Sequence, residues 1–92
     1  MKARESTMKY TPPTTNDLQA IRKGLGLTQS EMAEFIHVAG GQQWRKYTGG
    51  KNPRHMSFHM LFFLSAKLCL ETDELDRVYK KMVELGASLE SD

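Results

Sequence analysis

Apolar residues recur every three or four positions in five segments of the chain, and this spacing predicts five amphipathic helices. In the first segment, Leu18, Ile21 and Leu25 lie on one face of a helix. We expect this helix to begin at Thr14 or Thr15, whose hydroxyls are suited to cap a helix, and to end at the glycines that follow. The pattern as a whole indicates an all-α domain.

A glycine-containing turn joins the second and third predicted helices. Thr28 and Glu31 form a capping box that starts the second helix, because each side chain can bond to the backbone N–H of the other residue. The third helix covers about residues 41–48, and Trp44 and Tyr47, three positions apart, share its inward face. The buried side of the second helix is predicted to consist of Met32, Ala33, Phe35 and Ile36.

Two further helices follow a loop rich in glycine and basic residues. Ser57 is suited to cap a fourth helix over residues 57–69, and Thr72 a fifth that ends near Gly86. The residues expected to face inward from the fourth helix are Phe58, Leu61, Phe62, Leu64 or Ser65, and Leu68. This leaves Met60 and Phe63 on another face as a surface for a partner. The apolar stripe of the fifth helix is Leu75, Val78, Tyr79, Met82, Val83 and Leu89.

The length and composition predict one small domain in the cytoplasm. With 92 residues, the chain is expected to form a flexible basic arm over residues 1–13 and one domain over residues 14–92. No apolar run is long enough to span a bilayer, and the first residues lack the apolar core of a signal peptide. Cys69 is the single cysteine and lies in an apolar run, which predicts a buried, unreactive thiol.

Charge is distributed unevenly along the chain. The net charge is only +2, but residues 35–70 contain five Lys or Arg and no acid, whereas residues 71–92 contain three Lys or Arg and seven acids. A basic middle segment that coincides with a helix-turn-helix pattern favours nucleic acid as the partner over a merely solvated surface.

The third helix carries the side chains best suited to read DNA bases. Glutamine amides can bond to adenine and the arginine fork to guanine, so the predicted base-reading residues are Gln42, Gln43, Arg45 and Lys46. The predicted phosphate contacts are Thr28, Gln29, Tyr47, Thr48, Lys51 and Arg54. The predicted dimer interface is Met60, Phe63, Val78, Tyr79 and Met82.

The sequence does not suggest an enzyme, a metal site or a cofactor. His55 and His59 have a zinc-compatible spacing, but no nearby carboxylate completes a site and Met56 occupies the position of a catalytic glutamate. There is no glycine-rich phosphate cradle and no evident carboxylate pair.

From Leu18 to Leu75 the chain resembles the Cro/C1-type (xenobiotic-response-element) family of helix-turn-helix regulators. The specific part of the resemblance is the segment LTQSEMA, which begins at Leu27, and it is supported by Trp44, Tyr47 and Pro53. The turn before Trp44 is one residue longer than is usual in the family. The resemblance implies a five-helix, lambda-repressor-like domain that binds double-stranded DNA as a homodimer, with the third helix in the major groove and Gln29 at the family's phosphate-binding glutamine.

The sequence is therefore compatible with two functions. The first is an autoregulatory repressor from a phage or mobile element, bound to an inverted-repeat operator, although an activator fits the sequence too. The alternative is a module that uses the same scaffold to bind another protein, as an antitoxin or a phage-encoded inhibitor does.

Overall fold

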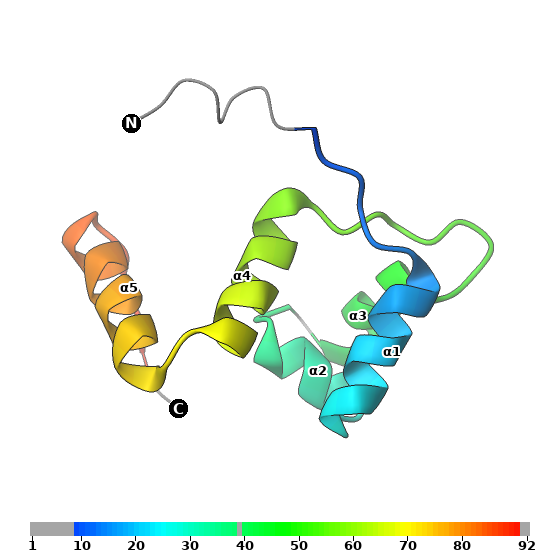
Figure 1. Ribbon diagram of the computed structural model, residues 1–92, viewed down its shortest axis with the longest axis horizontal. Coiled ribbons are helices and arrows are strands. Elements are labelled where there is room, and N and C mark those ends of the chain that lie inside the picture. The colour runs from blue at the N-terminus through cyan, green and yellow to red at the C-terminus, as the bar shows by residue number, and fades with distance from the viewer. Residues whose placement is uncertain (1–8, 39, 91–92) are drawn as a thin grey trace.

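The computed structural model describes residues 9–38 and 40–90, and this part of the chain contains helices and no strand. The helices are α1 (Thr15–Leu25), α2 (Gln29–Phe35), α3 (Gly40–Thr48), α4 (Phe58–Cys69) and α5 (Thr72–Glu84). Helices α1, α2 and α3 form a compact group, α4 lies beside it, and α5 lies on the far side of α4 (Figure 1). Of the helices described, none has both the length and the apolar character needed to cross a membrane. The predicted all-α class is confirmed.

Local capping determines where the helices begin. In α1, the backbone N–H of Asp17 donates to the Thr14 hydroxyl (3.1 Å), and the Thr14 N–H donates to the Asp17 carboxylate (2.9 Å). The same reciprocal bonds join Thr28 and Glu31 at the start of α2, as predicted. Ser57 accepts from the N–H of the third residue of α4, which confirms its predicted role.

The start of α5 differs from the prediction by one residue. Glu71, not Thr72, is the N-cap, because Glu71 has an extended backbone and its N–H donates to the Glu74 carboxylate at 2.8 Å. The capping partner is therefore an acidic side chain three positions along the helix, and not the hydroxyl of a Ser or Thr.

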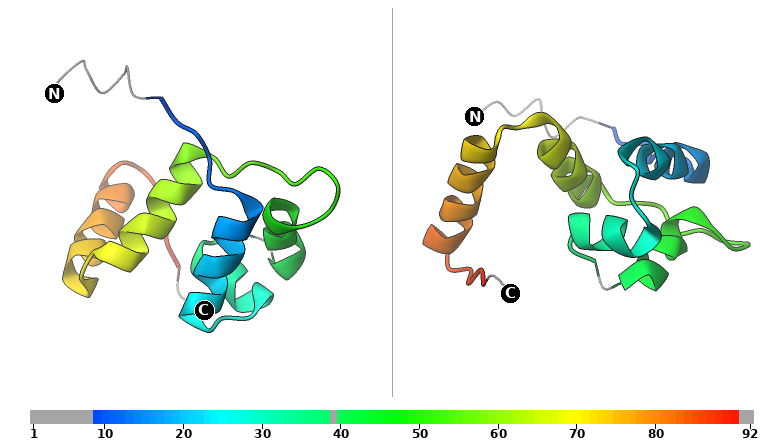
Figure 2. Two further views of the ribbon diagram at one scale, coloured as in Figure 1. Left: turned by 45° about the vertical axis from the view of Figure 1, so that its right-hand side comes forward. Right: turned by 90° about the horizontal axis from the view of Figure 1, so that it is seen from below.

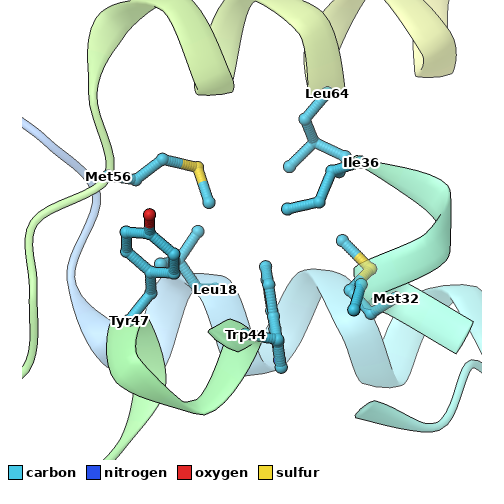
Figure 3. Close-up of a cluster of buried hydrophobic side chains, with 8 residues drawn as sticks. Leu18, Met32, Ile36, Trp44, Tyr47, Met56 and Leu64 are labelled. Carbon is cyan, nitrogen blue, oxygen red and sulfur yellow. The ribbon is translucent and has the colours of Figure 1, made fainter. Parts of the chain in front are cut away.

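A single apolar core joins the first four helices. Trp44 and Met32 are both 0% exposed, and their side chains converge with those of α1 and α4 in Figure 3. The buried core residues are Leu18, Met32, Ala33, Ile36, Trp44, Tyr47, Met56 and Leu64. Met56 belongs to the loop before α4, so helical periodicity could not reveal that it is buried.

The predicted inward face of α4 is right for Leu61 and Leu64 and wrong for Phe58, Phe62 and Leu68. Phe62 is 66% exposed and Phe58 is also exposed, whereas Met60 and Phe63 pack against the core. The hydroxyl of Tyr47 donates to the sulfur of Met60 at 3.2 Å, which holds this face of α4 against α3. Because α4 is apolar on nearly every side, its periodicity does not determine which face the rest of the chain covers.

The end of the predicted arm is attached to the domain. The Tyr10 hydroxyl donates to the Met56 carbonyl at 2.6 Å, and its ring meets Phe58 edge-to-face at 5.5 Å. Residues 1–8 of that arm lie outside the described residues. Tyr10, within the predicted arm, therefore contacts the loop before α4 and the first residue of α4.

Helix α5 lies apart from the core. In each view of Figure 2, as in Figure 1, α4 separates α5 from the group of α1, α2 and α3. Cys69, at the end of α4, is exposed, so the prediction of a buried thiol is also wrong. The connection at residues 70 and 71 directs the chain away from the body, which leaves the end of α4 uncovered.

Candidate nucleic-acid interface

Close packing of α2 against α3 positions the candidate interface. A Cβ atom on Gly41 would lie 3.1 Å from the Ser30 hydroxyl and 3.3 Å from the Ser30 backbone nitrogen. A glycine at position 41 therefore allows the first turn of α3 to lie directly against the first turn of α2. Ala33 of α2 is fully buried.

The turn between these helices uses left-handed backbone. His37 has a φ of 61° and Gly40 a φ of 79°, and the N–H of Val38 donates to the Ala33 carbonyl at 2.9 Å. His37 is a non-glycine residue with a left-handed backbone conformation, which L-residues rarely adopt. The chain therefore reverses sharply at this turn. Ala39, within this turn, lies outside the described residues.

Helix α3 has one buried and one exposed face. Trp44 and Tyr47 are buried, as predicted, and hold the helix to the core. Gln42, Arg45 and Lys46 are exposed, whereas Gln43 is half-buried. Three of the four predicted base-reading side chains are therefore exposed to solvent, and Gln43 is only partly so.

Arg45 and Gln29 are joined across the two helices. The Arg45 guanidinium donates to the Gln29 side-chain oxygen at 3.1 Å, and 16 positions separate the two residues. Gln29 is the first residue of α2, so this bond aligns the outer face of α3 with the start of α2. The sequence suggested separate base and phosphate roles for these residues but did not suggest that they contact each other.

The loop after α3 closes a basic hollow. The N–H of Arg54 donates to the Lys46 carbonyl at 2.6 Å, which folds the loop back against the end of α3. Gly50 has a φ of 82°, a conformation that favours glycine. The hollow measures about 550 Å³, and its lining residues are Gln42, Arg45, Lys46, Gly49, Gly50, Lys51, Asn52 and Arg54.

The side chains that line the hollow carry positive charge only. Four of its lining residues, Arg45, Lys46, Lys51 and Arg54, are cations, and none is acidic. Each of the four is also exposed. Positive charge without neighbouring carboxylates, together with amide groups and glycine backbone, suits an anion with several oxygen atoms, such as a phosphodiester.

The structure does not support two of the predicted phosphate contacts. Tyr47 is buried and its hydroxyl donates to Met60, and Thr48 is also buried. Both lie on the side of α3 that packs inward, so neither side chain is open to a phosphate. Thr28 is exposed but its hydroxyl oxygen caps α2, whereas the amide NH₂ of Gln29 has no hydrogen-bond partner among the described residues.

The predicted dimer residues divide into two groups. Met60 and Phe63 pack against the core of their own chain, so they are not the free surface that the sequence suggested. Val78 and Met82 are exposed and Tyr79 is half-buried, all on α5. On α4, the exposed residue Phe62 lines a groove beside α5 instead.

Comparison of the chain with protein-family models, with curated proteins and with solved structures finds no match. Any assignment of function therefore depends on the geometry of α2, α3 and the loop after α3. Asn52 and the glycines of this loop line the hollow without having been predicted as site residues, although the glycine-rich composition beside lysine and arginine was a visible signal.

Proposed function

We propose that this chain is a helix-turn-helix regulator of transcription that binds double-stranded DNA, with α3 in the major groove. The observation that carries the proposal is the basic hollow, in which four cations and no acid surround the exposed face of α3. A short helix anchored by Trp44 and presenting Gln42 and Arg45 outward has the size and chemistry to meet base edges. The lambda-repressor-like fold belongs to the same proposal.

The proposal assigns two kinds of contact. Arg45, oriented by Gln29, reads a base together with Gln42, and Lys46 lies beside them on the same exposed face. Lys51 and Arg54, on the loop, neutralise phosphates next to the groove. Gln29, the first residue of α2, donates its amide NH₂ to a phosphate.

A binding titration with DNA from upstream of the protein's own gene, beside random DNA of the same length, tests this division. Arg45→Ala should weaken binding to the specific site by about 1–3 kcal/mol and relax one base position. Lys51→Ala should weaken binding to both DNAs equally and reduce the salt slope by about one. Arg77→Ala, which removes a positive charge from α5, is the matched control and should leave the affinity nearly unchanged.

Either of two results would reject the proposal. One is no salt-dependent binding to any duplex. The other is an equal effect of all three variants on both DNAs.

The second candidate is binding to another protein through the same scaffold. The observation in its favour is the exposed apolar surface on α4 and α5, which includes Phe62, Val78 and Met82. The same titration separates the two candidates, because a pure protein-binding module would show no salt-dependent affinity for a DNA duplex.

A further inference from the structure

A pocket of about 600 Å³ lies where four segments of the chain meet. Its lining comes from the turn between α2 and α3, from α4, from α5 and from the segment that follows α5. None of its lining residues belongs to the basic hollow. A cavity of this size, lined by aromatic side chains and a few polar groups, has the dimensions and composition of a small-molecule site.

Apolar and aromatic side chains form the larger part of the lining. They are Phe63 of α4, Tyr79 and Met82 of α5, and Leu89. Phe63 and Tyr79 are half-buried, so part of each ring remains open to the pocket. The Phe63 ring meets the imidazole of His37 edge-to-face, with centroids 5.5 Å apart, which joins α4 to the turn before α3. A flat apolar molecule in this pocket would cover the open parts of these rings.

The reversal of the chain after α5 brings polar side chains to the same pocket. Gly86 has a φ of 117°, a conformation that favours glycine, and the N–H of Ala87 donates to the Met82 carbonyl at 2.9 Å. The chain then turns back along α5 (Figure 1). Ser88 and Glu90 therefore line the pocket together with the residues of α5.

The charge at the pocket is negative. Glu90 forms no ion pair with another described residue, and neither Lys nor Arg is among the residues that line the pocket. Lys67 lies 5.7 Å from the centroid of the Phe63 ring, but it donates to the Phe35 carbonyl at 3.0 Å and is not part of the lining. Because the faces of aromatic rings also attract cations, the lining suits a positive group attached to an apolar body.

We propose that this pocket binds a small aromatic molecule that carries a protonated amine. The aromatic ring of the ligand lies among Phe63, Tyr79 and Met82, and its ammonium group meets the Glu90 carboxylate. An anionic ligand is disfavoured, since Glu90 would repel it and no cation of the lining would bind it. The proposal does not rest on DNA binding, because the affinity is measured without DNA.

Calorimetric titration at neutral pH with three matched probes tests the charge preference. Tryptamine, indole-3-ethanol and indole-3-acetate share one ring system and differ in carrying a positive, a neutral and a negative group. Tryptamine should bind with a Kd of about 1 mM or tighter. The alcohol should bind at least about 5-fold more weakly, and the acetate more weakly still. No binding of tryptamine at about 10 mM, or equal affinity for all three probes, would overturn the proposal.

A neutral substitution tests the role of Glu90. Glu90→Gln keeps the size of the side chain and removes its charge, so it should abolish the preference for tryptamine over the alcohol. Asp76→Asn, which removes a carboxylate of α5 that does not line the pocket, is the matched control and should leave both affinities unchanged. Both residues are exposed, so both variants should keep the helical circular dichroism of the wild type. An unchanged preference in Glu90→Gln would overturn the assignment of the ammonium group.

The three histidines of the chain show where the probe binds. His37 lines the pocket, whereas His55 and His59 do not. Tryptamine should shift the imidazole proton signals of His37 in NMR spectra and leave those of His55 and His59 nearly unchanged. Equal shifts of all three would mean that the probe associates non-specifically, and would overturn the proposal. Neither result bears on the DNA-binding proposal, because the pocket and the basic hollow share no lining residue.

Discussion

Helices α3 and α5 each carry an apolar face and a charged face, but only the apolar face of α3 is buried by the rest of the chain. Trp44 and Tyr47 of α3 are buried among residues of three other elements, whereas α5 leaves Val78 and Met82 in solvent. The charged face of α3 borders a hollow lined by cations, whereas α5 carries charges of both signs and ends at Glu84, which pairs with Lys81. The comparison shows that an amphipathic pattern indicates a face to be covered, without indicating whether the same chain covers it.

The largest effect should come from removing the anchor of α3. Trp44→Ala is expected to lower the free energy of unfolding by about 3–5 kcal/mol, since the fully buried ring would leave a cavity. Trp44→Phe should lower the free energy of unfolding less. Phenylalanine lacks the indole N–H, which has no hydrogen-bond partner in the described part of the chain, so the substitution breaks no hydrogen bond. Urea unfolding of both variants checks the order, and an equal loss would contradict it.

A second substitution tests the contact between α2 and α3. Gly41→Val should destabilise the domain by roughly 1–3 kcal/mol, because the added side chain meets Ser30, including its backbone nitrogen. Gly24→Ala is the control: nothing lies within 4 Å of its Cβ position. It should stabilise α1 by about 0.5–1 kcal/mol. Thermal unfolding of the pair should show shifts of opposite sign.

Loss of a helix cap should have an intermediate effect. Thr28→Ala removes the hydroxyl that accepts from the Glu31 N–H, and is expected to cost about 1 kcal/mol. Thr28→Ser retains the oxygen and should recover most of the loss. Chemical denaturation measures both variants, and equal destabilisation by Ala and Ser would show that the methyl group matters and the cap does not.

Truncation on α5 should have little effect in the monomer. Val83→Ala removes a side chain that is already half-exposed, so the free energy of unfolding should change by less than about 0.5 kcal/mol. The measurement needs a protein concentration at which the chain is monomeric, because any self-association would add stability. A loss comparable with that of Trp44→Ala would mean that α5 packs on the body.

The smallest effect concerns Asp17, at the start of α1. Its hydrogen bonds from the Thr14 N–H and hydroxyl hold the pKa of this carboxyl below its ordinary value of 3.8. A lowered folded-state pKa contributes stability above the unfolded-state value, and this stability is lost as pH falls through the folded-state value. Asp17→Asn should therefore destabilise at neutral pH, and its difference from wild type should shrink in strong acid. A difference that does not change with pH would contradict this account.

Local features of the structure were predictable because their causes lie close together in the sequence. The caps at Thr14, Thr28 and Ser57 each use a backbone group three positions away, so the sequence alone determined where those helices begin. The acid-free segment between Glu34 and Glu71, which determines the sign of charge around α3, can also be counted directly.

Only the tertiary structure decided how the helices face one another. Met56 enters the core from a loop, Tyr47 donates to Met60, and Arg45 donates to Gln29 across 16 positions. A helix that is apolar all round, such as α4, has no preferred face until distant residues cover one side of it. The sequence therefore determined the helices and their charges, whereas long-range packing decided which side chains form the basic hollow and which apolar face of α4 and α5 remains open.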